Sequence, residues 1–207
     1  MVYTPTTWQD NVTVVNAARM TNIENELVYL DPRVPTYGTS LPASPVDGQQ
    51  AILVDSITNP SYQWLFRYNA GHSADAYKWE FIGGSPARSA VDNQESTASG
   101  SYVDLATPGP SFTVPRDGKY LIQASCGLVQ GASTAYAAGM SVTSTDISIP
   151  TMLNGAGPGW TSTISALGYD TVGLTAGTVL KMQYNVASAV SVSFYNRRLW
   201  VWPRKVS

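Results

Sequence analysis

Ionisable and sulfur-bearing side chains are scarce in this chain of 207 residues. It has one cysteine, Cys126, and one histidine, His72. A single cysteine cannot form an internal disulfide, and the sequence has no cysteine and histidine spacing typical of a zinc site. Charged residues make up 13% of the chain, which is about half the usual share. We therefore expect no disulfide framework, no bound metal and no other cofactor.

The chain also lacks a basic patch and a long hydrophobic run. Its formal net charge is −2, and no group of basic residues is larger than Arg197-Arg198. Because nucleic-acid binding normally requires a basic surface, we expect no nucleic-acid partner. A run of about 18 apolar residues is absent, which argues against a membrane-spanning helix. We expect no membrane insertion.

Serine and threonine replace the missing charges, at 42 of 207 positions. Hydrophobic residues make up 43%, enough for a packed core. From Lys119 through Asn196, only four of 78 residues are charged. A subunit interface explains this scarcity, since interface cores are depleted in charge. A monomer with an exterior rich in serine and threonine explains it equally well.

The first segment, residues 1–33, predicts one short helix. Asn16 is a suitable N-cap, and Asp31-Pro32 ends the helix because proline disfavours helical geometry in the preceding residue. A helix this short is marginal by itself in water, so it packs either on its own domain or in a bundle of identical helices. The candidate seam is a heptad stripe with spacings of three, four and three residues: Met20, Ile23, Leu27 and Leu30.

The second segment, residues 34–84, predicts a small antiparallel β-meander. Its strand candidates are Gln50–Asp55, Tyr62–Tyr68 and Tyr77–Ile82, and the last two alternate aromatic with other residues. Residues 85–101 are rich in serine, alanine and glycine, and are expected to be a linker or an extended strap.

The third segment, residues 102–207, predicts an all-β head. Eight short strands separated by proline and glycine turns indicate a β-sandwich, with a jelly roll as the expected topology. The predicted fold class is therefore mainly β, with a short N-terminal helix, a small antiparallel meander and a C-terminal sandwich. The strand candidates of the head are Tyr102–Ala106, Ser111–Val114, Gly118–Val129, Ala135–Thr143, Thr161–Leu167, Thr171–Leu174, Val179–Val186 and Val190–Val201.

Residues able to perform catalysis are few. His72 lies in a turn without a nucleophile motif, and Cys126 lies in mid-strand without a basic neighbour that would activate it. A glycosidase needs two carboxylates on either side of a bond. The head offers only four aspartates for that role, and we expect a non-enzymatic protein. These four are Asp104, Asp117, Asp146 and Asp170.

Seven aromatic residues of the head are candidates for a subunit interface or for stacking against a saccharide. Core packing is the alternative for each of them. The two tryptophans of the final strand alternate with Leu199 and Val201, so they face either the core or a neighbouring subunit. The candidates are Tyr136, Trp160, Tyr169, Tyr184, Tyr195, Trp200 and Trp202.

Two stretches resemble structural proteins of tailed bacteriophages. Residues 7–24, TWQDNVTVVNAARMTNIE, are similar to the opening of many such proteins, with Asn11 where glycine is usual. That resemblance implies an element for attachment and trimerisation. The order LPASPVDGQQA, WLFRYN and YKWEFIGG within residues 41–84 resembles a small module of phage tail and minor virion proteins.

The head resembles the trimeric jelly rolls of the C1q and TNF type. Residues 112–122, FTVPRDGKYLI, are similar to that family's Phe-x-x-Pro-x-x-Gly-x-Tyr motif. Residues 174–180, LTAGTVL, are similar to its Leu-x-x-Gly-Asp motif, with Thr178 where an acidic residue is common. The resemblance implies a head that trimerises through aromatic faces.

Together these features predict a homotrimeric virion protein of a tailed bacteriophage, exposed on the outside of the particle. The first segment would bind other virion proteins, and the head would adhere to a host-surface glycan. A tail fibre or spike is the leading version of this hypothesis. A capsid decoration protein or head fibre is the alternative, and a free carbohydrate-binding module is a further one.

Overall fold

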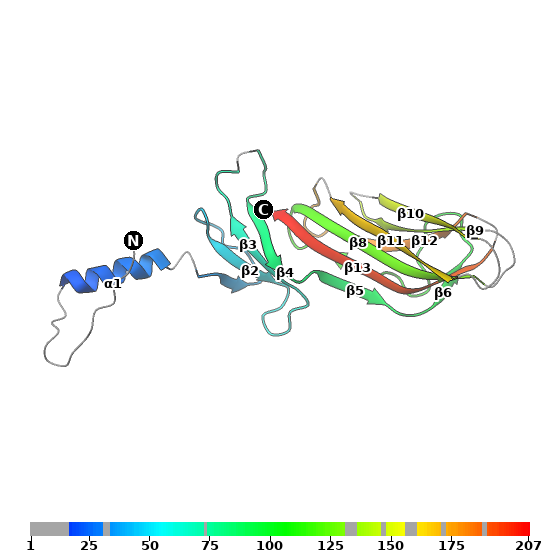
Figure 1. Ribbon diagram of the computed structural model, residues 1–207, viewed down its shortest axis with the longest axis horizontal. Coiled ribbons are helices and arrows are strands. Elements are labelled where there is room, and N and C mark those ends of the chain that lie inside the picture. Colours follow the sequence, from blue (N-terminus) through cyan, green and yellow to red (C-terminus); the bar gives the residue numbers. More distant parts are fainter. Residues whose placement is uncertain are drawn as a thin grey trace.

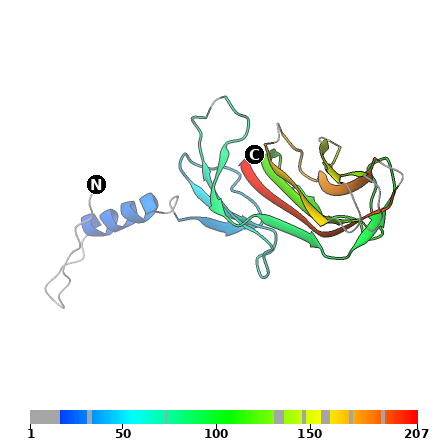
Figure 2. The same ribbon diagram turned by 45° about the vertical axis from the view of Figure 1, so that its right-hand side comes forward.

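The computed structural model describes residues 17–30, 34–72, 74–130, 136–145, 148–155, 161–170, 173–187 and 190–207. Within these ranges the chain forms one helix and thirteen strands. The helix α1, Ala17–Leu30, lies apart from the strands in both views (Figures 1 and 2). A helix in this segment was predicted and is observed; its candidate N-cap, Asn16, and its candidate end, Asp31-Pro32, lie outside the described residues. No helix in these ranges is long and apolar enough to cross a bilayer.

The middle of the chain forms the predicted meander, with one further strand at its edge. β2, β3 and β4 pair antiparallel in sequence order. β1 pairs parallel with β2, and the sequence pattern did not reveal it because it has only three residues. The strands are β1 (Thr36–Gly38), β2 (Gln50–Val54), β3 (Gln63–Tyr68) and β4 (Trp79–Gly84).

The stretch expected to be a linker or an extended strap contains two short strands. β5 (Ala87–Val91) and β6 (Glu95–Thr97) both pair antiparallel with the long final strand, β13 (Val192–Val206). β4 also pairs with β13, near the C-terminal end of that strand. This segment therefore runs along the head, as Figure 1 shows.

The head is a sandwich of two sheets, and the predicted fold class is confirmed. β13, β8 and β11 continue the sheet of the meander, so that nine strands belong to it. The opposite sheet has the order β10-β9-β12-β7. The remaining strands are β7 (Ser111–Thr113), β8 (Gly118–Val129), β9 (Tyr136–Thr143), β10 (Ser148–Gly155), β11 (Thr161–Asp170) and β12 (Val179–Val186).

The bounds of β7, β11 and β13 differ from the predicted ones, and three further assignments differ in kind. The candidate Tyr102–Ala106 contributes only an isolated bridge from Val103, and in the candidate Thr171–Leu174 the described residues contribute only a bridge from Leu174. β10 was not predicted, because Pro150 interrupts its pattern. Proline is tolerated there since β10 is an edge strand, whose outer N–H groups need no partner strand.

One hydrophobic core runs from the meander into the head. The buried rings of Trp64 on β3 and Tyr120 on β8 lie with their centroids 6.3 Å apart. Tyr62 stacks on Trp64 at 4.0 Å and meets Phe112 of β7 edge-on at 6.2 Å. Buried aromatic rings of this size contribute strongly to the hydrophobic stabilisation of a folded core. The meander and the head are therefore held together by shared aromatic packing.

Candidate functional site

The apolar stripe of the helix is exposed. Met20, Ile23 and Leu27 are 44%, 39% and 60% accessible to solvent. Leu30 is the last residue of α1, and its side chain lies outside the described part. In both views the helix stands clear of the sheets (Figures 1 and 2). Of the two packing alternatives, docking on the chain's own domain is therefore not observed for this stripe.

The outer face of the meander carries a second apolar surface that sequence reasoning missed. Tyr37, Ile52 and Leu65 are cross-strand neighbours on β1, β2 and β3. Tyr37 is exposed, Ile52 and Leu65 are half-buried, and Ile82 of β4 is exposed. The available signal was that the positions between the buried residues of β2 and β3 are also apolar. A strand that is apolar on both faces indicates a sheet covered on both faces.

The seven aromatic candidates of the head do not form one site. Tyr184 is fully buried in the core, where its hydroxyl donates to the carbonyl of Gly109 at 3.0 Å. Tyr195 is half-buried, with its ring against Gly127. Tyr136 and Tyr169 belong to β9 and β11, but their side chains lie outside the described part, as does all of Trp160.

Trp200 and Trp202 lie on the outer face of the long sheet. Their neighbours in β13, Leu199 and Val201, are fully buried on the opposite face, whereas both tryptophans are half-buried. The register places Trp202 beside Leu121 of β8. Of the two expectations for these side chains, the structure excludes the core and leaves a surface available to a partner.

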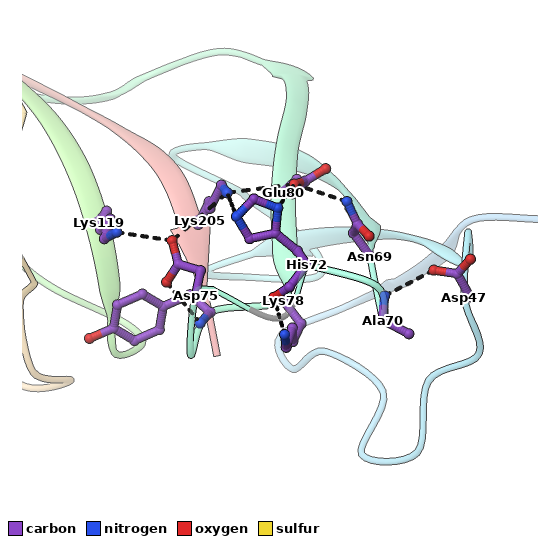
Figure 3. Close-up of polar contacts among 10 residues, drawn as sticks. Asp47, Asn69, Ala70, His72, Asp75, Lys78, Glu80, Lys119 and Lys205 are labelled. Carbon is purple, nitrogen blue, oxygen red and sulfur yellow. Dashed lines mark hydrogen bonds and ion pairs between the residues drawn. The ribbon is translucent and has the colours of Figure 1, made fainter.

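A cluster of charged side chains joins the meander to the head (Figure 3). Nζ of Lys205 on β13 lies 2.7 Å from Nε2 of His72, in the turn before β4. An ammonium group only donates, so His72 accepts through Nε2, and its Nδ1 faces Glu80 at 3.7 Å. The imidazole of His72 therefore lies between the ammonium group of Lys205 and the carboxylate of Glu80.

Asp75 is the second connection within this cluster. Its carboxylate lies 2.9 Å from Nζ of Lys119 on β8 and 3.8 Å from Nζ of Lys205. The hydrogen bond from Lys119, the backbone N–H of Tyr77 and the charges of both lysines lower the pKa of Asp75. The cluster therefore holds one turn of the meander against two strands of the head by electrostatic contacts.

The segment with β5 and β6 is fastened to the head by Arg197. Its fully buried guanidinium donates to the carbonyl of Thr107 at 3.0 Å and to Glu95 at 3.2 Å. It also lies 5.6 Å from the centre of the Tyr184 ring. Hydrogen bonds from the hydroxyl and the amide of Thr107, with the charge of Arg197, lower the pKa of Glu95. The carboxylate of Glu95 therefore stays ionised next to the buried guanidinium of Arg197.

Two of the few charges between Lys119 and Asn196 are neutralised within the chain. Lys119 pairs with Asp75, and Lys181 pairs with Asp104 at 2.7 Å. The side chains of Asp146 and Asp170 lie outside the described part. β11 instead presents exposed threonine and serine at Thr161, Thr163 and Ser165. The described outer surface of β11 is therefore polar and uncharged.

The candidate catalytic groups are placed as follows. Cys126 is fully buried, 3.6 Å from the sulfur of Met140, and burial raises the pKa of its thiol to about 12. Asp117 accepts a hydrogen bond from the backbone of Ala176, at 2.7 Å. Among the described residues, no group of three or more histidine, cysteine, aspartate or glutamate side chains could hold a metal ion.

No protein-family model and no curated protein sequence matches this chain. Among solved structures, it is similar to Eiger TNF from S. frugiperda, with a TM-score of 0.38 and 12% identity over 59% of this chain and 94% of that one. It is also similar to a structure of infectious bursal disease virus, Gx strain, with a TM-score of 0.42 and 13% identity over 79% of this chain and 40% of that one. These values assign the chain to no family.

Proposed function

We propose that this chain is a non-enzymatic structural protein of a tailed-bacteriophage virion, assembled as a homotrimer. Its first segment attaches to other virion proteins, and its head adheres to a host-surface glycan. The leading location is a tail fibre or spike. The observation that carries the proposal is the exposed stripe of Met20, Ile23 and Leu27 on a helix separated from the rest of the chain.

A 14-residue helix is marginal in water without tertiary packing. Because the stripe has heptad spacing, identical helices are its simplest partners, and three of them would bury it about a common axis. The residues that resemble phage attachment elements overlap the same helix. A trimer also provides three copies of each weak surface contact, and many copies per particle convert weak binding into strong attachment.

The surface chemistry of the head supports the proposal as well. β11 exposes serine and threonine, and Lys181 is paired with Asp104. The half-buried Trp200 and Trp202 offer a surface for a neighbouring subunit or a sugar, since one side of an aromatic ring suits either partner.

Native mass spectrometry of the full-length chain tests the assembly. A trimer is expected, and a monomer at micromolar concentration would contradict the proposed seam and favour a free carbohydrate-binding module. Mass spectrometry of purified phage tails and of tail-free capsids tests the location. Presence in the tails is expected, whereas presence in the capsids alone would identify a decoration protein or head fibre.

A further inference from the structure

A groove with both polar and apolar walls lies where the meander, β5 and β7 meet. Its volume is about 540 Å³, within the range of small-molecule sites in proteins. Residues from the end of β2 and the loop before β3 form one side, and β5 and β7 form the other. The groove is separate from the helix stripe and contains none of the seven aromatic candidates of the head.

The walls of the groove are fixed by the core. Tyr62 is held by its stacking on Trp64, whose indole N–H donates to the carbonyl of Ser85 at 3.0 Å. The amide of Ser111 on β7 donates to the hydroxyl of Ser89 on β5 at 3.3 Å, which ties the two strand edges together. A ligand would therefore meet a preformed site and lose little free energy to ordering the protein.

The lining of the groove favours hydroxyl groups. Thr39, Ser61, Ser89, Ser111 and Thr113 supply hydroxyls that both donate and accept. Asp55 and Arg88 are the charged residues in the lining, so its formal net charge is zero. A groove with no net charge and several hydroxyls suits a neutral ligand rich in hydroxyl groups.

Asp55 is the acceptor around which such a ligand would be oriented. Its carboxylate oxygens accept from the amide of Ser61, at 2.8 Å, and from the Ser61 hydroxyl. Burial opposes its ionisation, but the hydrogen bonds from Ser61 and from the backbone of Asp55 and Tyr62 together outweigh burial and lower the pKa of Asp55. Asp55 is exposed to solvent, so ligand hydroxyls can reach its carboxylate oxygens.

We propose that this groove binds a short neutral saccharide, with Asp55 accepting hydrogen bonds from adjacent sugar hydroxyls and Phe112 and Pro115 contacting the apolar face of the sugar. The inference deepens the adhesive part of the proposed function and rests on it for the source of the sugar. The groove is open to solvent on one side, so single-site binding is weak, and the copies in a trimer supply the strength of attachment.

The test is an NMR titration of the ¹⁵N-labelled full-length chain with maltose, lactose and N-acetylglucosamine, each to about 50 mM. We expect at least one of them to shift the amides of Ser89, Ser111 and Thr113. Asp55→Asn should weaken that binding about tenfold, because hydrogen bonds to a charged acceptor are the stronger ones. Asp47→Asn is the matched control, since Asp47 also accepts a backbone N–H, that of Ala70, away from the groove.

Because Asp55→Asn also removes a charged acceptor of Ser61, a second variant is needed that leaves the Ser61 turn unchanged. Thr113 is exposed on a strand edge, so Thr113→Tyr should fold and fill the groove, abolishing the shifts. If the shifted amides cluster around Trp200 and Trp202, saccharide binding in the groove is contradicted, whereas adhesion by the head is still supported. If none of the three sugars shifts these amides, the proposal that the groove binds a neutral saccharide is wrong. Whether phage particles that lack the chain still adsorb to host cells tests the proposed function separately.

Discussion

The guanidinium of Arg197 is fully buried and lies 3.2 Å from the carboxylate of Glu95, which precedes it by 102 residues. A buried charge is costly unless it is paired and hydrogen-bonded. Arg197 meets that requirement only when the segment containing β6 lies along the head. This contact therefore makes the packing of residues 85–101 a condition for a stable head.

Arg197→Met should lower the free energy of unfolding by about 3 kcal/mol, because it leaves Glu95 and the carbonyl of Thr107 without their charged partner. Urea denaturation followed by tryptophan fluorescence measures the effect. Arg198→Met is the matched control. Arg198 pairs with the exposed Asp92, and a surface pair is worth less than about 1 kcal/mol. Equal losses in the two variants would contradict the structural role assigned to Arg197.

Ile23→Asp combined with Leu27→Asp should abolish the trimer and leave the β-sandwich folded. Each aspartate places a charge in an apolar seam, so association should weaken by at least about tenfold per substitution. Native mass spectrometry and circular dichroism measure the two properties. Thr21→Asp with Asn25→Asp adds the same charge on the opposite face of α1 and should assemble normally. Normal assembly of the Ile23 and Leu27 variant would mean that the stripe is not the seam.

Gly84→Ala should destabilise the meander by about 3 kcal/mol. Gly84 has φ +120°, and a Cβ there would lie 2.0 Å from the carbonyl oxygen of Gln63. The neighbouring Gly83 has open space around its Cβ position. Gly83→Ala should therefore change the denaturation midpoint little, and it controls for the chemical change. Similar midpoints for the two variants would show that the backbone of β4 relaxes without cost.

Acid should loosen the contact between the meander and the head through Asp75. Its pKa is lowered in the folded chain by Lys119, Tyr77 and Lys205, so the unfolded chain binds this proton first as the pH falls. The stabilisation is complete above the ordinary carboxyl pKa of about 3.9 and is lost as the pH falls through the lowered value. We expect the difference in urea midpoint between the wild type and Asp75→Asn to be constant from about pH 7 to 5 and to shrink below about pH 4.

Measuring that difference, rather than the midpoint of the wild type alone, separates Asp75 from Glu95, whose pKa is also lowered. Glu95 is present in both proteins, so its protonation affects both midpoints alike. A difference that persists unchanged to about pH 2 would contradict the assignment of this stabilisation to ionised Asp75.

The sequence by itself determined the parts of the fold that depend on local pattern. Apolar spacing placed a helix in the first segment, and the turn at Pro115 and Gly118 placed the start of β8, whose bounds were predicted as observed. Alternation indicated β3 and β4, with the start and end of β4 shifted by two residues, because one buried face imposes a period of two. The heptad stripe was likewise readable, since it depends only on spacing along one helix.

Only the tertiary structure decided what depends on which strands become neighbours. Residues 85–101 carry too few apolar side chains to reveal a strand, and β5 and β6 form because β13 offers them an open edge. Tyr184 and Trp200 are both aromatic strand residues, yet one packs in the core and the other faces outward, because the register of β12 and β13 assigns their faces. The groove at Asp55 joins residues more than 50 positions apart along the chain, and no local pattern encodes a contact made by long-range packing.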